Sequence, residues 1–538
     1  MRTNSLLKER IVYCQKLGDD HVAGKVFLVG AGPGEAKLIT VKGLECIQKA
    51  DVIVYDRLAS PRLLKQIKPG AQKIYVGKLP DRHTMKQEEI NQLLVDLALQ
   101  DKIVVRLKGG DPTIFGRVGE EAELLKKNGI PFEIVPGVTS AIAVPAYAGI
   151  PVTHRDLASS LSIITGHESP DKLDQSIHWD KVTNATGTLV FMMGVSKIGY
   201  ISNQLMKYGR SPETPIALIR WGTRAEQATI TGTLADIEEK VKQADFKPPA
   251  VIVVGDVVKQ REKLKWAELL PLFGKRIVVT RSRSQASELV NRIEELGGEP
   301  YEFPVIETVA PKDEITLSQI KQSLSNMEQY DWVFFTSVNG VEFFFQHLEE
   351  LGGDIRSLHK ARIAAVGPAT AEALRKKGIV SEKLPERFQA EGLVEAFGSE
   401  FIPGQKVLLP RGDLARSWLP EKLRGLGLNV TEVTIYETVM TGEDDIELLK
   451  WIEEKAIDAV TFTSSSTVTN FMAILRRMGI EDPVAALEGI DIACIGPLTA
   501  KTASEAGLNV TMLAKEASID SLLDTLCKWN NHNLNIGL

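Results

Sequence analysis

Short runs of Val, Ile and Leu alternate along this chain with longer amphipathic segments, and this alternation constrains the fold more than any other feature. Segments with helical spacing, such as residues 87–99 and 118–127, separate the first of these runs. Apolar runs that end in glycine or an acid are typical of buried strands, and their alternation with helices predicts a largely parallel α/β sheet. The first four runs are residues 25–30, 51–56, 102–111 and 132–137.

A second set of apolar runs follows and predicts a second α/β lobe, with a cleft between the two lobes. These runs are residues 161–166, 187–194, 214–222 and 249–258. A charged segment with helical spacing, 259–273, then precedes a fresh strand–helix unit. We therefore expect residues 24–264 and 265–538 to form separate units, with a domain boundary near residue 265.

The C-terminal half contains an internal repeat. Its paired segments are 334–345 with 462–471, 364–378 with 493–507, and 274–289 with 404–419. All three pairs have an offset of about 130 residues, which predicts two similar α/β lobes, whereas a solenoid needs shorter and more numerous units. Bilobal α/β units place ligands between their lobes, at the carboxyl ends of strands.

The composition narrows the function classes. A chain of 538 residues is too long for one hydrophobic core, and its net charge of −6 argues against a general nucleic-acid binder. The four cysteines form no CxxC and the eight histidines form no HxxxH, so we expect neither a disulfide framework nor a metal site. No apolar run approaches the ~20 residues that span a bilayer.

The N-terminal stretch, residues 1–23, has only short apolar pieces interrupted by charge. It lacks the pattern of a secretory signal, so we expect an N-terminal extension of unassigned function on a cytoplasmic protein with no membrane association.

The segment GAGPG, residues 30–34, follows a predicted strand directly. Its glycines allow a tight turn and the close approach of a ligand to backbone N–H groups. Asp56 ends the next strand, where a ribose-binding acid would lie in an NAD-linked oxidoreductase. The third glycine of GxGxxG is missing, so this pattern alone leaves dinucleotide binding as one alternative.

A more specific motif is RLKGGDPTIFGR, residues 106–117. Two glycines let the chain bend at a strand end, Asp111 supplies a carboxylate there, and three basic residues lie nearby. A helix rich in small residues follows within 135–155, entered through Pro136 and Gly137 and capped by Thr139 or Ser140.

Together with TGH at 165–167, FMMG at 191–194 and GTRAEQ at 222–227, these motifs resemble uroporphyrinogen-III C-methyltransferase over residues 24–260. The resemblance implies two α/β lobes with S-adenosylmethionine (SAM) bent in the cleft between them, and a homodimer through this half. One departure is Thr113, where the family usually has an aromatic residue after GGDP.

The resemblance also implies roles for single residues. Asp56 is similar in position to the family's proposed proton acceptor, Lys78 to its proposed proton donor, and Arg106 to a residue facing the tetrapyrrole. Asp56 also fits a plain strand-end cap and Lys78 a surface charge, so both alternatives stay open. The implied SAM contacts are Pro33, Gly109, Gly110, Asp111, Ile114, Thr139, Ser140, Met193 and Gly222.

The repeats of the C-terminal half place hydroxyl groups at strand ends and helix starts, which are good anion-binding positions. We expect the hydroxyls of one lobe to face those of the other and arginines to add charge nearby, whereas ordinary caps on two ligandless lobes are the alternative. These segments contain no serine–histidine–acid constellation, so we do not expect a hydrolase. The residues are Thr336, Ser337 and Asn339 in one lobe, Thr463, Ser464 and Ser465 in the other, and Arg281, Arg283, Arg411 and Arg416.

These segments resemble uroporphyrinogen-III synthase over residues 274–530. In that family the lobes exchange segments, which implies that the strand near Arg281 packs with the lobe containing 462–507. Tyr436 matches the family's candidate proton donor. Arg281, Thr336, Ser337, Arg411, Thr463 and Ser464 are the implied substrate-binding residues.

The two resemblances together imply a bifunctional enzyme of tetrapyrrole biosynthesis. It would close hydroxymethylbilane to uroporphyrinogen III and methylate that product twice with SAM to precorrin-2, in the sirohaem or cobalamin branch. The alternatives are a methyltransferase with a non-catalytic tetrapyrrole-binding C-terminal half, and an NAD-linked oxidoreductase.

Overall fold

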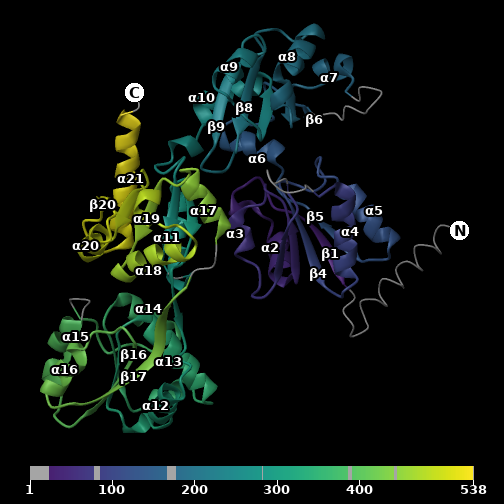
Figure 1. The fold of residues 1–538 in the computed structure, drawn as a ribbon. Coiled ribbons are helices and arrows are strands. Elements are labelled where there is room, and N and C mark those ends of the chain that lie inside the picture. Colours follow the sequence, from purple (N-terminus) through teal and green to yellow (C-terminus); the bar gives the residue numbers. More distant parts are fainter. Residues whose placement is uncertain are drawn as a thin grey trace.

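The computed structural model describes residues 24–77, 85–166, 177–281, 283–385, 390–441 and 445–536. Its strands form four five-stranded sheets, each with helices packed against it, and we refer to the four units as lobes 1 to 4. Figure 1 shows lobes 1 and 2 beside lobe 3, while lobe 4 extends from the far side of lobe 3. No helix among the described residues is long and apolar enough to cross a membrane.

Lobe 1 confirms the parallel sheet expected for the first four apolar runs. Its strand order is β3-β2-β4-β1-β5, with every pairing parallel. The predicted helices at 87–99 and 118–127 are α4 and α5. The elements are β1 (Lys25–Gly30), η1 (Ala36–Leu38), α2 (Val41–Lys49), β2 (Val52–Tyr55), α3 (Pro61–Leu64), β3 (Gln72–Tyr75), α4 (Gln87–Ala98), β4 (Ile103–Lys108), α5 (Val118–Lys127) and β5 (Phe132–Val135).

Lobe 2 has the order β6-β7-β10-β8-β9, and only β6 and β7 pair in parallel. The sheet is therefore mainly antiparallel, because β8 and β9 are joined by the short segment 221–227, which forms a hairpin without a crossover helix. The elements are α6 (Ser140–Tyr147), which leads into the lobe, β6 (Leu161–Thr165), α7 (Trp179–Ala185), β7 (Thr188–Met192), η2 (Val195–Lys197), α8 (Ile198–Lys207), β8 (Pro215–Arg220), β9 (Ala228–Thr233), α9 (Ile237–Gln243) and β10 (Ala250–Val254).

The charged segment after lobe 2 consists of three short helical pieces rather than one helix. They are η3 (Asp256–Gln260), α10 (Arg261–Leu264) and η4 (Ala267–Leu269). Lobe 3 begins after them.

Lobe 3 is built from two distant parts of the chain, in the order β12-β11-β18-β19-β20. Ile277 of β11 pairs with Ala459 of β18, which confirms the implied exchange of the strand near Arg281. The elements are β11 (Arg276–Val279), α11 (Arg283–Glu295), β12 (Glu299–Glu302), α17 (Ile446–Glu453), β18 (Ala459–Phe462), α18 (Ser465–Arg477), α19 (Pro483–Ala486), β19 (Asp491–Cys494), α20 (Pro497–Glu505), β20 (Val510–Leu513) and α21 (Ile519–Ile536).

Lobe 4 is formed by the intervening residues, in the order β13-β17-β16-β14-β15. Only β13 is antiparallel to its neighbour. The elements are β13 (Ile306–Val309), α12 (Glu314–Ser325), η5 (Met327–Gln329), β14 (Trp332–Phe335), α13 (Val338–Glu350), η6 (Ile355–Leu358), β15 (Arg362–Ala365), α14 (Pro368–Lys376), α15 (Ala390–Phe397), η7 (Gly398–Glu400), β16 (Lys406–Gly412), α16 (Trp418–Gly425) and β17 (Asn429–Met440).

The internal repeat is visible in three dimensions. Ser337 and Ser464 each cap the helix that follows an equivalent strand, accepting a hydrogen bond from the third helical N–H. Gly367 and Gly496 precede the next pair of helices, which both begin with proline. Lobes 3 and 4 are therefore two copies of one α/β unit, as the offset of about 130 residues predicts.

Candidate active sites

Three glycine-containing loops of lobe 1 meet at the carboxyl ends of β1, β4 and β5. Gly32 and Gly110 form a backbone bridge, in which the N–H of Gly110 donates to the carbonyl of Gly32 over 2.7 Å. A Cβ placed on Gly30 would lie 2.6 Å from the Cα of Gly137 and 2.7 Å from the carbonyl oxygen of Gly110. Such distances admit only glycine, so the backbone itself shapes this end of lobe 1.

Asp111 fastens these loops together. One of its carboxylate oxygens accepts a hydrogen bond from the N–H of Gly137 (2.9 Å), and the other accepts one from the N–H of Thr113 (2.7 Å). The Thr113 hydroxyl also donates to this carboxylate. Threonine, where the family usually has an aromatic residue, therefore adds a local contact. Thr139 caps α6 through the N–H of Ala141, which confirms one of the two predicted caps.

Lobe 2 reaches this loop cluster through the segment after β8. A Cβ on Gly222 would lie 2.5 Å from the Val144 side chain on α6, and the Thr223 hydroxyl accepts a hydrogen bond from the N–H of Glu35 (3.0 Å). The Tyr147 hydroxyl also contacts the Glu35 carboxylate, and burial together with this carboxylate raises the pKa of the phenol. We did not predict this group from the sequence, because Glu35, Tyr147 and Thr223 come from three separate segments of the chain.

The predicted SAM contacts thus fall into two groups. In the second group, Gly109 packs against Leu58 and Ile114 forms a turn onto Asp111. The first group lies in the loops that converge and consists of Pro33, Gly110, Asp111, Thr139, Ser140 and Gly222. Met193 lies at the end of β7 with a positive φ of 58° and is half exposed. No described contact joins Met193 to the other predicted residues.

Asp56, at the end of β2, is paired with Arg106 of β4, their side chains 3.3 Å apart. Arg106 is buried, and its guanidinium also contacts Glu121 (3.3 Å) and the carbonyls of Val54 and Leu107. These contacts use four of the five guanidinium donors of Arg106 and make it a support for Asp56. Lys78 lies outside the described residues.

Glu121 on α5 is an additional charged residue that the sequence reading missed. It is fully buried and lies 2.6 Å from the ammonium group of Lys108 as well as against Arg106. Burial, followed by the neighbouring Arg106, lowers the pKa of Lys108. The two cations of RLK therefore share one buried acid.

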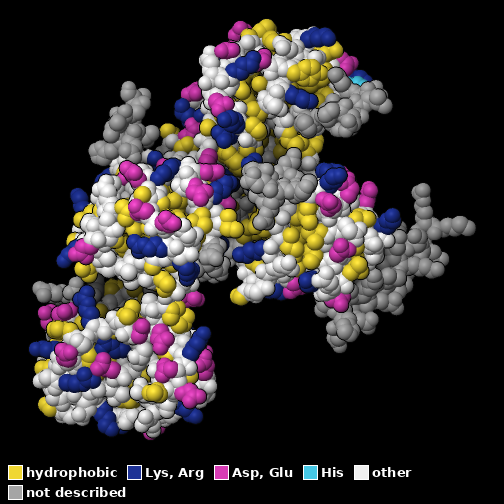
Figure 2. Space-filling model, in the orientation of Figure 1, with side chains coloured by type: hydrophobic (Ala, Val, Ile, Leu, Met, Phe, Trp, Pro, Cys, Tyr) yellow, Lys and Arg dark blue, Asp and Glu magenta, His cyan; other side chains and the backbone are white. Residues whose placement is uncertain are grey.

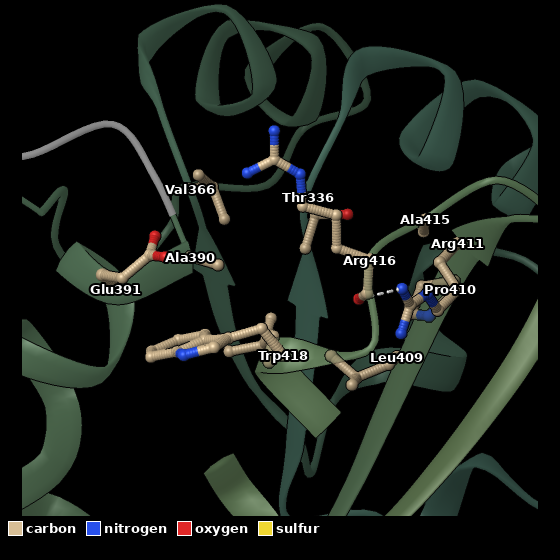
Figure 3. Close-up of a pocket in the computed structure, with 11 residues that line it drawn as sticks. Thr336, Val366, Ala390, Glu391, Leu409, Pro410, Arg411, Ala415, Arg416 and Trp418 are labelled. Carbon is tan, nitrogen blue, oxygen red and sulfur yellow. Dashed lines mark hydrogen bonds between the residues drawn. The ribbon is translucent and has the colours of Figure 1, made fainter. Parts of the chain in front are cut away.

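In the C-terminal half, a cavity of 310 Å³ opens at the carboxyl ends of β14, β15 and β16 in lobe 4. Its wall contains Thr336, Glu391, Arg411, Arg416 and Trp418. Figure 3 shows the Arg416 guanidinium projecting into this cavity, whereas Arg411 turns back to the Arg416 carbonyl. Arg411 is also tied to Glu432 at 2.6 Å, so its charge is already paired.

Tyr436, on β17, lies beside the cap of α13. Its hydroxyl is 3.3 Å from that of Ser337, and its ring stacks on Phe343 at a centroid distance of 5.5 Å. A Cβ on Gly412 would touch the Tyr436 ring at 2.5 Å, so a glycine on the neighbouring strand leaves room for the phenol.

The predicted hydroxyl sets stay on their own lobes. Ser464 bonds to Thr467 and Ser466, while Ser465 accepts from Thr502, all within lobe 3. Among the described residues, no hydrogen bond joins these hydroxyls to Thr336, Ser337 or Asn339 of lobe 4. Burial lowers the pKa of Arg281, and the nearby negative charge of Glu288 offsets part of that effect. No group of three or more His, Cys, Asp or Glu in the described ranges could hold a metal ion.

Comparisons with known proteins agree with this arrangement. The family "Tetrapyrrole (Corrin/Porphyrin) Methylases" matches residues 25–238, and "Uroporphyrinogen-III synthase HemD" matches residues 287–524. The porphyrin biosynthesis protein HemD of Ruminiclostridium josui is 40% identical over 95% of this chain and 99% of its own length. The uroporphyrinogen-III C-methyltransferase of Priestia megaterium is 56% identical over 44% of this chain and 98% of its own.

A crystal structure of uroporphyrin-III C-methyltransferase from Thermus thermophilus, complexed with S-adenosyl homocysteine, is 37% identical and covers 44% of this chain and 99% of that one, with a TM-score of 0.39. The full-length relative from R. josui and the two consecutive family matches lead to one conclusion. The chain belongs to the HemD porphyrin biosynthesis family, as a tetrapyrrole methylase followed by a uroporphyrinogen-III synthase.

Proposed function

We propose that the chain converts hydroxymethylbilane to uroporphyrinogen III in its C-terminal half, and methylates that product twice with SAM to precorrin-2 in its N-terminal half. The boundary is placed at residues 264 and 265, and a homodimer through lobes 1 and 2 is part of the proposal. The observation that carries it is the convergence of the glycine loops of lobe 1 with the Gly222 segment of lobe 2. The proposed proton acceptor Asp56, with its partner Arg106, belongs to the same lobe as these glycine loops.

The residues of the N-terminal half fit SAM. The glycines let the loops after β1 and β4 approach each other at Gly32 and Gly110, and Asp111 ties the second loop to Gly137. When bound, SAM supplies an electrophilic methyl group. The protein orients a pyrrole carbon toward that methyl and removes a ring proton once the new bond has formed.

Asp56 is the proposed acceptor of that proton. Its ion pair with Arg106 holds the carboxylate in place, and Arg106 is itself fixed by the buried Glu121. Lys78 is the proposed donor that returns a proton elsewhere on the macrocycle. Arg106 is proposed to position Asp56 and, as the resemblance implies, to face the tetrapyrrole.

The C-terminal half needs to fold its linear substrate and assist loss of the terminal hydroxyl as water. Tyr436 is the proposed proton donor to that hydroxyl, oriented by Ser337 and by stacking on Phe343. Arg416 and Arg281, with the hydroxyls of Thr336, Thr463 and Ser464, would bind the substrate's carboxylates. Closure of lobes 3 and 4 around the substrate would bring the two hydroxyl sets together.

Two half-reactions test the proposal without oxygen. Purified protein given uroporphyrinogen III and SAM is expected to form a doubly methylated product by mass spectrometry. The same protein given hydroxymethylbilane alone is expected to form the type-III isomer. If only the spontaneous type-I isomer appears, lobes 3 and 4 bind tetrapyrroles without turnover; if NAD binds in place of SAM, the N-terminal half is an oxidoreductase.

A further inference from the structure

The contact between lobe 1 and lobe 3 is made of charged side chains with a consistent polarity. Lobe 1 contributes cations from η1, α3 and the residue after α3, and lobe 3 contributes acids from α11, β12 and the start of α17. Arg62 pairs with Glu294 and lies 3.6 Å from Glu302. Lys37 also pairs with Glu294, at 2.7 Å. Figure 1 shows α3 directly beside lobe 3.

Lys65 strengthens the same contact. Its ammonium lies 3.7 Å above the centre of the Tyr301 ring and 3.6 Å from Asp445, and it also donates to the carbonyl of Glu302. Tyr301 is buried and its hydroxyl bonds to Asp445 at 2.6 Å. Helix α3 follows Asp56 by only a few residues, so this contact anchors the segment that carries the proposed proton acceptor.

Lobe 2 is attached to lobe 3 through the segment that follows Gly222. The Glu299 carboxylate accepts a hydrogen bond from the N–H of Ala225 (2.9 Å) and lies 3.5 Å from the Arg224 guanidinium. The oxygen that accepts from Ala225 also pairs with Arg276 of lobe 3, at 3.0 Å. Arg276 is 1% exposed and also pairs with Glu226 of lobe 2. Burial alone would raise the pKa of Glu299, but Arg224 and Arg276 outweigh it and hold the pKa below its usual value.

Between these two contacts lies a cavity of 230 Å³, whose wall includes Gly34, Thr223, Arg224, Glu299 and Pro300. The loops that carry the proposed cofactor contacts are therefore separated from lobe 3 by unfilled space at this point. The separation of these loops therefore depends on the contacts on either side of the cavity, and lobe 3 supplies the partner residues for both contacts.

We propose that lobe 3 acts as a bracket across lobes 1 and 2, fixing the opening of the methyltransferase cleft, with Glu299 as its central positioning residue. This inference rests on the proposed function, because it takes the Gly30–Gly34 and Gly222 segments as the SAM site. Lobe 4 takes no part in the bracket: Figure 2 shows it standing away from lobes 1 and 2, below lobe 3.

The test compares full-length variants Glu299→Gln and Glu294→Gln with Glu481→Gln, an exposed acid of lobe 3 away from the join. SAM affinity is measured by calorimetry, and KM and kcat for methylation of uroporphyrinogen III are measured separately. For Glu299→Gln and Glu294→Gln we expect Kd and KM for SAM to rise about 10-fold, within the usual range of coupling between sites. We expect kcat and the synthase turnover to change less than about twofold, and Glu481→Gln to match the wild type.

Unchanged Kd and KM for SAM in both bracket variants would overturn the inference, as would a loss confined to kcat. Because Glu299 neutralises the buried Arg276, Glu299→Gln can unfold lobe 3, which loss of synthase turnover would reveal; Glu294→Gln then decides. If the wild type binds SAM but methylates no uroporphyrinogen III, the proposed function fails while the calorimetric comparison still tests the bracket.

Discussion

In the N-terminal half, glycine loops meet at backbone distance, whereas in the C-terminal half the candidate residues are side chains that remain on two separate lobes. Gly30 and Gly137 leave no room for a Cβ, and Gly110 has a positive φ of 68°. Arg416 and Tyr436, in contrast, project from lobe 4 without contact to the hydroxyls of lobe 3 among the described residues. The backbone therefore shapes the first proposed site in advance, whereas the second proposed site is built from individual side chains and, in our proposal, is completed by closure of lobes 3 and 4.

The largest expected effect comes from the backbone of the first site. In Gly30→Ala the new Cβ would meet the Cα of Gly137 and the carbonyl of Gly110, so the three loops must separate. We expect methyl transfer to fall by more than about 100-fold, because displacements near 1 Å already have such effects. Synthase turnover should persist.

Gly119→Ala is the matched control, because a Cβ there meets nothing within 4 Å on an exposed helix position. Its methyl transfer should equal that of the wild type and its stability should rise slightly. If Gly30→Ala retains methyl transfer, the loops do not form the site.

A second prediction concerns a side chain of lobe 4. Tyr436→Phe removes the hydroxyl next to Ser337 while keeping the ring stacked on Phe343. We expect formation of the type-III isomer to slow by roughly 10- to 100-fold, at the low end for general acid catalysis. Tyr330→Phe, in the core of the same lobe, serves as the control, and equal rates for the two variants would remove Tyr436 as proton donor.

The two arginines of the lobe 4 cavity should respond differently. Arg416 projects into the cavity, whereas Arg411 is buried against Glu432. Arg416→Ala is expected to raise KM for hydroxymethylbilane about 10-fold, the value of one charged hydrogen bond, with no change in melting temperature. Arg411→Ala is expected to lower the melting temperature and to affect KM less. If Arg411→Ala raises KM more than Arg416→Ala does, Arg411 is the substrate contact instead.

The smallest effect concerns a feature that the two halves share. Asp51, Asp331 and Asp458 each precede a strand and accept a hydrogen bond from an N–H of the neighbouring strand, over 2.8 Å. At Asp51, Lys68 and then the N–H of Ile103 lower the pKa of the carboxyl. Its stabilisation is therefore present above the unfolded-state pKa and is lost as the pH falls through the lower folded-state pKa.

Asp51→Asn should thus lower stability at pH 7 by less than about 1 kcal/mol, since the partly exposed pair is screened by solvent. The difference from the wild type should shrink as the pH falls through the lowered folded-state pKa of Asp51. Thermal unfolding over this pH range measures this, with the exposed Asp245→Asn as the control. A difference that does not shrink with falling pH would show that the carboxylate charge is not its origin.

Much of the fold could be predicted because local patterns determine it. Alternating apolar runs predicted the parallel sheet of lobe 1, and the repeat predicted the equivalence of lobes 3 and 4, down to the helix caps at Ser337 and Ser464. The antiparallel character of lobe 2 could not be read in the same way. Strand β9, with the sequence ATITGT, has little apolar signal, and its pairing follows from a short connection to β8.

The site was predictable only where a motif holds its residues together. The three glycine loops lie within recognisable motifs, so their convergence followed from strand order. The partners that fix them are distant in sequence: Glu121 neutralises Arg106 and Lys108, Thr223 meets Glu35, and Glu299 reaches across from lobe 3. Such pairs are set by packing between elements, which periodicity does not encode.

The most direct test of the whole account starts from hydroxymethylbilane alone, without oxygen, and adds SAM to one of two reactions of the purified full-length protein. We expect uroporphyrinogen III without SAM and its doubly methylated product, precorrin-2, with SAM. Appearance of only the type-I isomer in both reactions would contradict it.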